Sequence, residues 1–357
     1  MALPQEHGRA EPREAQTGHR DGSPGLEGRH GERDDDDDDP RERAHRDHRA
    51  RIEQRFGQRW WLRLVCHWHQ RYRSVVAQLV DVADTDDARL DDFRDLNSID
   101  RRPDLPSGKG LVIGEGVLVA RRMLGSRFTP FALMGTDRRL TELRDDLAAV
   151  DIPYYRVDAD VMKQVVGFHL NRGVLAAARR PPTLAVRDVI EDARTLAVLE
   201  GVNDHENLGS IFRNAAGLGA DAVVFGAGCA DPLYRRAVRV SMGHALLVPY
   251  AAVETWPGDL NLLRENGFHL LAMTPDPGAA TLAEAMARVG HDKVAILVGA
   301  EGPGLTRQAM RASDMLVRIP MSRGTDSLNV ATATALAFYE RARLAAMSRL
   351  REEQPSP

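Results

Sequence analysis

Cysteine and long hydrophobic runs are nearly absent from this sequence of 357 residues. Its only two cysteines, Cys66 and Cys229, are too few and too widely spaced to predict a disulfide framework or a zinc cluster. No run of about 18 apolar residues occurs, and the chain is polar from its first residues, so we expect neither a membrane-spanning helix nor a secretory signal. These absences predict a cytoplasmic protein without a membrane partner.

Lysine is also scarce: it occurs only at positions 109, 163 and 293, and arginine supplies almost all of the positive charge. The formal net charge is -4 at pH 7, which excludes a protein coated with positive charge. Any binding of nucleic acid therefore has to come from a local basic patch. The hydrophobic fraction of 43% is sufficient for a real core, and the length predicts about two domains.

The N-terminal segment differs in composition from the rest of the chain. Residues 1 to about 50 lack apolar periodicity and include the acidic run Asp34–Asp39, a composition that cannot bury enough surface to fold. From Ile52 to about Val82 a partly helical pattern carries several Trp and Arg residues. Such a helix can lie on RNA or on a membrane surface, but we favour a helix packed on the body of the protein or a start of translation near Val75 or Val76. We therefore treat residues 1–84 as an extension that is disordered or not translated.

Residues 85–182 have the pattern of a small α/β domain. Short apolar runs at 111–113, 131–134, 154–157 and 174–178 predict strands, which alternate with predicted helices at 115–124, 138–149 and 158–166. The sequence Arg179-Arg180-Pro181-Pro182 then disfavours both helix and central strand, so we place a domain boundary there.

A second α/β series occupies residues 190–349 and is followed by a tail at 350–357. Strands are predicted at 196–199, 222–225, 270–273, 294–298 and 315–319, and helices at 207–217, 232–241, 258–266, 281–288, 304–311 and 326–346. This alternation predicts a mostly parallel sheet covered by helices on both faces. Such sheets bind ligands at the carboxyl ends of their strands, and the unusual motifs of this sequence lie there.

The first motif follows the strand at 196–199 and leads into the helix at 207–217. One stripe of this helix, opposite the apolar stripe, consists of Glu206, Gly209, Arg213 and Gly217. Glycine costs a helix interior roughly 1 kcal/mol relative to alanine, so the two glycines indicate that something approaches the backbone beside the arginine. Arg213 taken alone is more typical of an ordinary surface position.

The second motif follows the strand at 294–298 and reads Gly299-Ala300-Glu301-Gly302-Pro303-Gly304. Its G-x-x-G-x-G spacing differs from the G-x-G-x-x-G of dinucleotide-binding loops, which disfavours a nicotinamide-dependent oxidoreductase. The third motif follows the strand at 315–319 and runs from Ile319 to Val330. Asp326 and Ser327 are plausible N-caps of the helix predicted at 326–346, so a purely structural role for this motif stays open.

Together, in this order and on this α/β frame, the three motifs resemble those of the SpoU (TrmH) family of RNA ribose methyltransferases, within the SPOUT superfamily. The family pattern N-x-G-x-x-x-R is matched by Asn207, Gly209 and Arg213, and the pattern G-x-E-G by Gly299, Glu301 and Gly302. The pattern I-P-M followed by S-L-N is matched by Ile319, Pro320, Met321, Ser327, Leu328 and Asn329. More loosely, Gly114-Glu115-Gly116 and the segment 167–176 resemble the ribosomal-protein-like RNA-binding domain that often precedes this catalytic domain.

The resemblance implies a SPOUT-type parallel sheet flanked by helices, whose C-terminal part is threaded into a trefoil knot, preceded by a small α/β RNA-binding domain. It also implies S-adenosylmethionine as the cofactor, bound in a bent form and held mainly by backbone groups. The corresponding candidates for cofactor binding are Thr274, Gly299, Gly302, Ile319, Met321 and Leu328. Methyl transfer from a sulfonium requires no metal, since the leaving group departs neutral, and we expect none.

The implied reaction is methylation of a ribose 2'-hydroxyl, and the candidate catalytic residues are Arg213, Asn207, Glu301, Ser327 and Asn329. An arginine keeps its proton in proteins, so Arg213 is poorly suited to take the proton from the hydroxyl directly. We favour a guanidinium that binds the phosphate beside the target ribose and stabilises the developing alkoxide. The other four residues then place or accept the proton.

The implied substrate is RNA, and ribosomal RNA is favoured over transfer RNA because the additional N-terminal domain is commoner among enzymes that act on ribosomal RNA. Candidate phosphate contacts are Arg101, Arg102, Arg172, Arg235, Arg236 and Arg239, which are equally compatible with a solvated face. The resemblance further implies a homodimer that uses the helix predicted at 326–346. The alternative is a non-catalytic RNA-binding or assembly protein with the same fold. Such a protein should have lost some of the motif residues, and all of them are present in this sequence.

Overall fold

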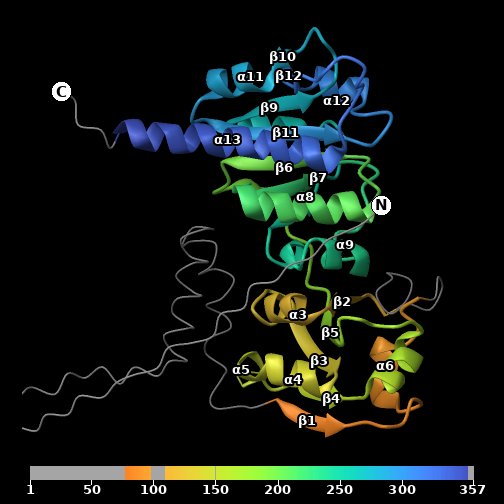
Figure 1. Ribbon diagram of the computed structural model, residues 1–357. Coiled ribbons are helices and arrows are strands. Elements are labelled where there is room, and N and C mark those ends of the chain that lie inside the picture. The colour runs from red at the N-terminus through yellow and green to blue at the C-terminus, as the bar shows by residue number, and fades with distance from the viewer. Residues whose placement is uncertain (1–76, 98–108, 149, 353–357) are drawn as a thin grey trace, which may run out of the picture. The chain divides into compact units, whose positions relative to one another are not determined.

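Figure 1 shows the computed structural model, which describes residues 77–97, 109–148 and 150–352. The expectations for residues 1–76, the end of the tail and the candidate RNA contacts Arg101 and Arg102 lie outside these residues. The described residues all fall in one compact unit and form two separate β-sheets. None of the described helices is both long enough and apolar enough to cross a membrane.

The N-terminal sheet has the strand order β1-β4-β3-β5-β2. The four predicted strands are confirmed, and β1 is an additional edge strand in the segment that the sequence assigns to the extension. Because β1 is mostly exposed, it lacks the apolar alternation that predicts a strand. The helix predicted at 138–149 is broken into α4 and α5. The elements of this domain are β1 (Gln78–Asp81), η1 (Ala88–Phe93), β2 (Leu111–Glu115), α3 (Val117–Leu124), β3 (Thr129–Gly135), α4 (Asp137–Glu142), α5 (Arg144–Leu147), β4 (Pro153–Arg156), α6 (Ala159–Val166) and β5 (Val174–Arg179).

The C-terminal sheet has the order β10-β12-β9-β11-β6-β7-β8, and every neighbouring pair is parallel. The parallel sheet and its five predicted strands are therefore confirmed, while the knot stays a prediction. The strands are β6 (Thr195–Glu200), β7 (Ala222–Phe225), β8 (Tyr250–Ala252), β9 (Phe268–Met273), β10 (Ala280–Thr281), β11 (Lys293–Gly299) and β12 (Met315–Arg318). The unpredicted strands β8 and β10 are only three and two residues long, too short to show a periodic pattern.

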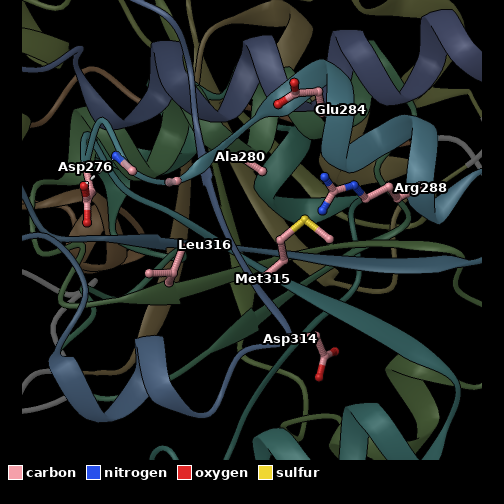
Figure 2. A pocket seen from close by; sticks show the side chains of 9 residues that line it. Asp276, Ala280, Glu284, Arg288, Asp314, Met315 and Leu316 are labelled. Atoms are coloured by element: carbon pink, nitrogen blue, oxygen red, sulfur yellow. Dashed lines mark hydrogen bonds between the residues drawn. The ribbon is translucent and has the colours of Figure 1, made fainter.

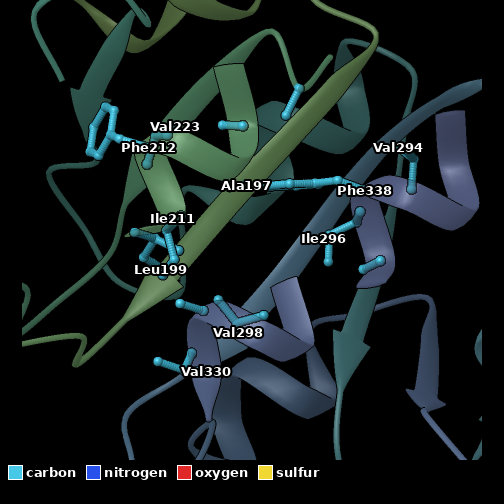
Figure 3. Packing of buried hydrophobic residues seen from close by; sticks show 14 of the residues in the cluster. Ala197, Leu199, Ile211, Phe212, Val223, Val294, Ile296, Val298, Val330 and Phe338 are labelled. Carbon is cyan, nitrogen blue, oxygen red and sulfur yellow. The ribbon is translucent and has the colours of Figure 1, made fainter. Parts of the chain in front are cut away.

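Helices cover both faces of this sheet, as expected, because its central strands bury side chains on both sides. Along β6, Ala197 and Leu199 enter one apolar cluster, whereas Leu196 and Val198 enter the other. Figure 3 shows the first cluster, in which residues of α8 and α13, including Phe212 and Phe338, pack on strands β6, β7 and β11. The helical elements are α7 (Val186–Ile190), α8 (His205–Leu218), α9 (Arg235–Val240), η2 (His244–Leu246), α10 (Leu260–Glu265), α11 (Leu282–Val289), α12 (Arg307–Arg311) and α13 (Val330–Glu352).

The last helix begins later than the sequence predicts. Instead of position 326, α13 starts at Val330, and Asn329 caps it: its Oδ1 accepts hydrogen bonds from the amides of Ala331 and Thr332 at 3.0 and 3.2 Å. The prediction that Asp326 or Ser327 caps the helix is wrong. A turn closes just before these two residues, where Gly324 has a φ of 84° and the amide of Thr325 donates to the carbonyl of Ser322.

The two glycines of α8 have different surroundings. A Cβ on Gly209 would lie 2.7 Å from the carbonyl oxygen of Ala237, so the close approach that the sequence predicts is made by α9 of the same chain. A Cβ on Gly217 would have no atom within 4 Å. Gly209 therefore permits helix packing, and Gly217 has no such function in the described part of the chain.

The pair Gly209→Ala and Gly217→Ala tests this difference. Gly217→Ala should raise the free energy of unfolding by roughly 0.5–1 kcal/mol through helix propensity. Gly209→Ala should lower it by about 1–2 kcal/mol, since overpacking against α9 outweighs the same propensity gain. Urea unfolding followed by circular dichroism measures both, and equal stabilisation by the two substitutions would refute the packing role of Gly209.

Candidate active site

The first and second motifs lie side by side because their strands are neighbours. β11 pairs with β6 in parallel, and Gly299 is the register partner of Glu200. The chain continues from β6 into Gly201, which has a φ of 68° and whose Cβ would lie 3.0 Å from the Cβ of Ala300. Both motifs therefore leave the sheet at the same carboxyl edge, where parallel sheets bind ligands.

A ring of hydrogen bonds joins one residue from each of the three motifs. The Nδ2 of Asn207 donates to Oε1 of Glu301 at 2.8 Å. The Nδ2 of Asn329 donates to Oδ1 of Asn207 at 2.7 Å and to the same Oε1 of Glu301 at 2.9 Å. We call this set of three residues the motif ring. It brings together three of the five predicted catalytic residues, and hydrogen bonds to a charged group of this kind contribute about 1.5–3 kcal/mol each.

Two residues of the motif ring lie at helix N-termini. Asn329 is the cap of α13, and Asn207 lies in the first turn of α8, where Asp204 accepts hydrogen bonds from the amides of Glu206 and Asn207, both at 2.8 Å. The partial positive charge of a helix N-terminus favours a nearby anion. The carboxylate of Glu301 is therefore hydrogen-bonded to a residue at the start of each helix.

The glycines of the second motif let its loop fold back onto the end of β11. A Cβ on Gly299 would lie 2.1 Å from the carbonyl carbon of Gly304, so no other residue fits there. The amide of Gly304 donates to the carbonyl of Ala300 at 3.0 Å. Gly302 and Gly304 have φ values of 85° and 68°, which side-chain-bearing residues rarely adopt. The fold-back presents Glu301 at the tip of a tight turn.

Glu200 supports this loop, a role that the sequence reasoning missed. Glu200 is 5% exposed, and its Oε2 accepts a hydrogen bond from the amide of Thr306 at 2.8 Å. Its Oε1 accepts from the hydroxyl of Thr306 at 2.9 Å and from Nε1 of Trp256. A buried carboxylate requires such partners. The sequence signal that could have identified Glu200 is a charged residue at the end of an otherwise apolar strand.

Arg213 and Ser327 lie outside the motif ring. Arg213 is exposed on α8, six residues beyond Asn207 and thus about 9 Å along the helix axis. Among the described residues, the side chain of neither one makes a hydrogen bond or an ion pair, so the guanidinium is presented alone, as expected.

The candidate cofactor residues follow the ends of neighbouring strands. Thr274 follows β9, and its amide donates to the carbonyl of Val317 on β12 at 2.8 Å. Ile319 and Met321, which follow β12, are half-buried, and Leu328 is 37% exposed. This edge of the sheet therefore offers partly exposed apolar side chains beside the polar motif ring.

The candidate RNA contacts that the structure describes take part in ion pairs within the chain. Arg236 is exposed and bonded to Glu206 of α8. Arg235, Arg239 and Arg172 all face the carboxylate of Glu115, with nitrogen-to-oxygen distances of 3.0, 3.3 and 3.7 Å. Arg235 is the most buried of these, with a side chain only 14% exposed.

The thiol of Cys229 lies beside the first motif. Its Sγ donates to the carbonyl of Leu199 at 3.2 Å, and it lines a pocket of about 300 Å³ together with Phe225 and Tyr250. Burial raises the pKa of the Cys229 thiol, and it raises the pKa of Tyr250 to about 12. Both groups stay protonated at neutral pH, so neither provides an anionic nucleophile or base.

A pocket of about 590 Å³ lies apart from the motifs, along α11, β10 and β12. Figure 2 shows Glu284 and Arg288 of α11 on one side of it and Met315 and Leu316 of β12 on the other. None of the predicted site residues lines this pocket. The motif ring, rather than the larger pocket, therefore defines the candidate active site.

Several known proteins are similar to this chain in sequence or in fold. A sequence profile of the SpoU rRNA methylase family matches residues 194–339. A protein of Mycobacterium bovis named as an uncharacterized tRNA/rRNA methyltransferase is 75% identical over 263 residues, which are 74% of this chain and 91% of that protein. A 23S rRNA (guanosine-2'-O-)-methyltransferase of Bordetella pertussis is 35% identical over 177 residues, 48% of this chain and 71% of that protein. The crystal structure of an AdoMet-bound rRNA methyltransferase from Sinorhizobium meliloti is similar in fold, with a TM-score of 0.62 at 22% identity, covering 74% of this chain and 98% of that one.

The substitution Asn329→Asp tests the motif ring. It keeps the oxygen that caps α13 but replaces the amide donor with a second carboxylate next to Glu301. We expect the free energy of unfolding at pH 7 to fall by about 2 kcal/mol, because two hydrogen bonds become a repulsion.

The matched control is Asp204→Asn, the reverse exchange, which replaces an aspartate with an asparagine at the cap of α8. It should change the free energy of unfolding by less than about 0.5 kcal/mol. Both are measured by chemical unfolding. An Asn329→Asp variant as stable as the unsubstituted protein would show that the motif ring does not contribute to the stability of the fold.

Proposed function

This chain belongs to the SpoU rRNA methylase family, and from that premise we propose that it transfers a methyl group from S-adenosylmethionine to a ribose 2'-hydroxyl of RNA. The observation that carries the proposal is the motif ring, in which Asn207, Glu301 and Asn329 meet. The ribose as acceptor is supported by the name of the Bordetella pertussis relative, a guanosine-2'-O-methyltransferase.

The residues at the carboxyl edge fit S-adenosylmethionine. The fold-back at Gly299 and the turn at Gly302 expose main-chain groups, which suit the polar parts of the cofactor. Ile319, Met321 and Leu328 would contact its apolar surface, and Thr274 would close the site from the end of β9. When bound, the cofactor supplies a methyl group on a sulfonium centre. The AdoMet-bound state of a protein of similar fold supports this assignment.

The chain's own residues have to align the hydroxyl and relieve it of its proton. The exposed guanidinium of Arg213 would bind the phosphate beside the target ribose bidentately and stabilise the developing alkoxide. Within the motif ring only Glu301 can accept a proton at neutral pH, since amides cannot, and the ring hydrogen bonds use only its Oε1. Asn207 and Asn329 would hold that carboxylate in place, and Ser327, outside the ring, would contact the substrate.

The proposed substrate is ribosomal RNA rather than transfer RNA, and the proposed location is the cytoplasm. The Bordetella pertussis relative is named for 23S rRNA, and a small α/β domain precedes the catalytic sheet in this chain. A non-catalytic RNA-binding protein is disfavoured because Arg213, Glu301, Ser327 and Asn329 are all present.

We also propose a homodimer that is joined through α13. Leu336 and Tyr339 lie one turn apart on this helix and are 40% and 55% exposed, while Ala337 and Phe338 between them are buried in the core. Large apolar side chains at this spacing form a stripe that favours helix packing. Leu328, 37% exposed and just before the helix, would place the interface next to the cofactor site.

The substitution Arg213→Lys tests the proposed reaction. A lysine keeps the charge but cannot bind a phosphate bidentately. We therefore expect kcat to fall about 100-fold, the loss typical of removing one hydrogen-bond donor to the transition state. Calorimetric affinity for S-adenosylmethionine should stay unchanged.

The assay follows tritium transfer from S-adenosylmethionine to unmodified 23S rRNA transcribed in vitro. Arg187→Lys, which changes an exposed arginine on α7, is the control and should retain full activity. An Arg213→Lys variant that keeps most of its rate contradicts the assigned role of Arg213, and failure of the unsubstituted protein to bind S-adenosylmethionine contradicts the proposed function as a whole.

The substitution Leu336→Glu tests the dimer. A buried, unpaired carboxylate in the interface should convert the protein to a monomer in light scattering after gel filtration. Leu118→Glu is the control, because Leu118 is a similarly exposed leucine (38%) on helix α3, and that variant should remain dimeric. Unchanged mass for Leu336→Glu would place the interface elsewhere.

A further inference from the structure

A buried carboxylate connects the N-terminal domain to α9 of the catalytic domain. Glu115 ends β2, and its side chain is only 6% exposed. Its Oε2 accepts hydrogen bonds from Arg235 at 3.0 Å and from Arg239 at 3.3 Å, and Nε of Arg172 lies 3.7 Å from its Oε1. Three guanidinium groups thus face one carboxylate.

The cluster is built from specific contacts rather than from mobile surface side chains. Arg235 also donates to the carbonyl of Leu96 at 3.2 Å and lies over the ring of Phe168, 5.0 Å from its centroid. Gly116, with a φ of 96°, passes directly under Arg172: a Cβ on Gly116 would lie 3.0 Å from Cδ of that arginine. These contacts hold the arginines in defined directions before any ligand arrives.

Two of the three arginines also reach solvent. The side chains of Arg172 and Arg239 are 41% and 33% exposed, whereas that of Arg235 is 14% exposed. A guanidinium has five N–H donors, and Glu115 takes only part of them. Arg172 and Arg239 therefore keep donors available for an external anion.

The cluster is continuous with the candidate active site through two helices. α9, which carries Arg235 and Arg239, packs on α8 where a Cβ on Gly209 would meet Ala237. Gly209 lies between Asn207 and Arg213 on α8. An RNA strand whose ribose lies at the motif ring would thus have neighbouring phosphates within reach of α9 and of the N-terminal domain.

We propose that Arg172 and Arg239, oriented by Glu115, form a phosphate-binding site for the RNA substrate that exists only when the N-terminal and catalytic domains are joined. The inference rests on the proposed function, since it concerns the same substrate. A phosphodiester is negatively charged and matches the bidentate geometry of the exposed guanidinium groups of Arg172 and Arg239. Glu115 does not touch the RNA and is a positioning residue.

If Glu115 is a positioning residue, its replacement should change the affinity for RNA in the direction opposite to that expected from net charge alone. If Glu115 were only a negative charge near the RNA, its removal would strengthen binding, since the surface becomes more positive. If Glu115 orients the two arginines across the domain junction, its removal weakens binding in spite of the added positive charge.

The experiment measures the affinity of Glu115→Gln for unmodified 23S rRNA by filter binding at several salt concentrations. We expect the Kd to rise about 10-fold and the slope of log Kd against log salt to fall by about 0.7–0.9, which corresponds to one lost phosphate contact. Calorimetric affinity for S-adenosylmethionine should not change, which separates this result from a failure of the proposed function. Binding as tight as that of the unsubstituted protein, or tighter, overturns the proposal.

A second variant covers the case in which Glu115→Gln fails to fold. Arg172→Gln removes only the longest and most exposed of the three ion pairs and should fold normally while showing the same loss of affinity and slope. Arg138→Gln, which changes an arginine on α4 that is 79% exposed and paired with Glu142, is the control and should bind RNA normally. An Arg172→Gln variant with unchanged Kd and slope refutes the phosphate site.

Discussion

The candidate active site depends on one set of hydrogen bonds, those that join Asn207, Glu301 and Asn329. The partners in two of these bonds are separated by 94 and 122 residues along the chain. The charge-assisted bonds to Glu301 hold the ends of three strand-to-helix connections in one position. The pairing of β6 with β11 and the fold-back at Gly299 bring the motifs to one edge of the sheet, and the motif ring fixes their side chains relative to one another.

The rest of the catalytic domain can be understood as the frame for this ring. Parallel pairing of β6 with β11 places the first two motifs at one edge, and alternating side chains anchor β6 in apolar clusters on both faces of the sheet. Gly299 permits the fold-back that carries Glu301, and Glu200 fixes the far end of that loop through Thr306. Gly209 lets α9 approach α8, so the arginines of α9 lie beside the helix that carries Asn207 and Arg213.

Most of this frame could be predicted from the sequence, because long buried strands and amphipathic helices have strong periodic signals. The exceptions have physical reasons. β8 and β10 are too short for a pattern, and β1 is too exposed. The cap of α13 was misplaced because Asp326, Ser327 and Asn329 are all good caps, and only the turn at Gly324 decides among them. Contacts such as Glu115 with Arg235, 120 residues apart, have no local signal at all. The glycine pattern correctly predicted a close approach to α8, but not that α9 makes it.

The central claim is that the motif ring serves methyl transfer to a ribose hydroxyl. The most direct test is to incubate the protein with methyl-labelled S-adenosylmethionine and unmodified 23S rRNA, digest the RNA to nucleosides and identify the labelled species by mass spectrometry. The account predicts label in a 2'-O-methylnucleoside. Label confined to a methylated base would contradict it, as would the absence of label from RNA when the protein binds the cofactor.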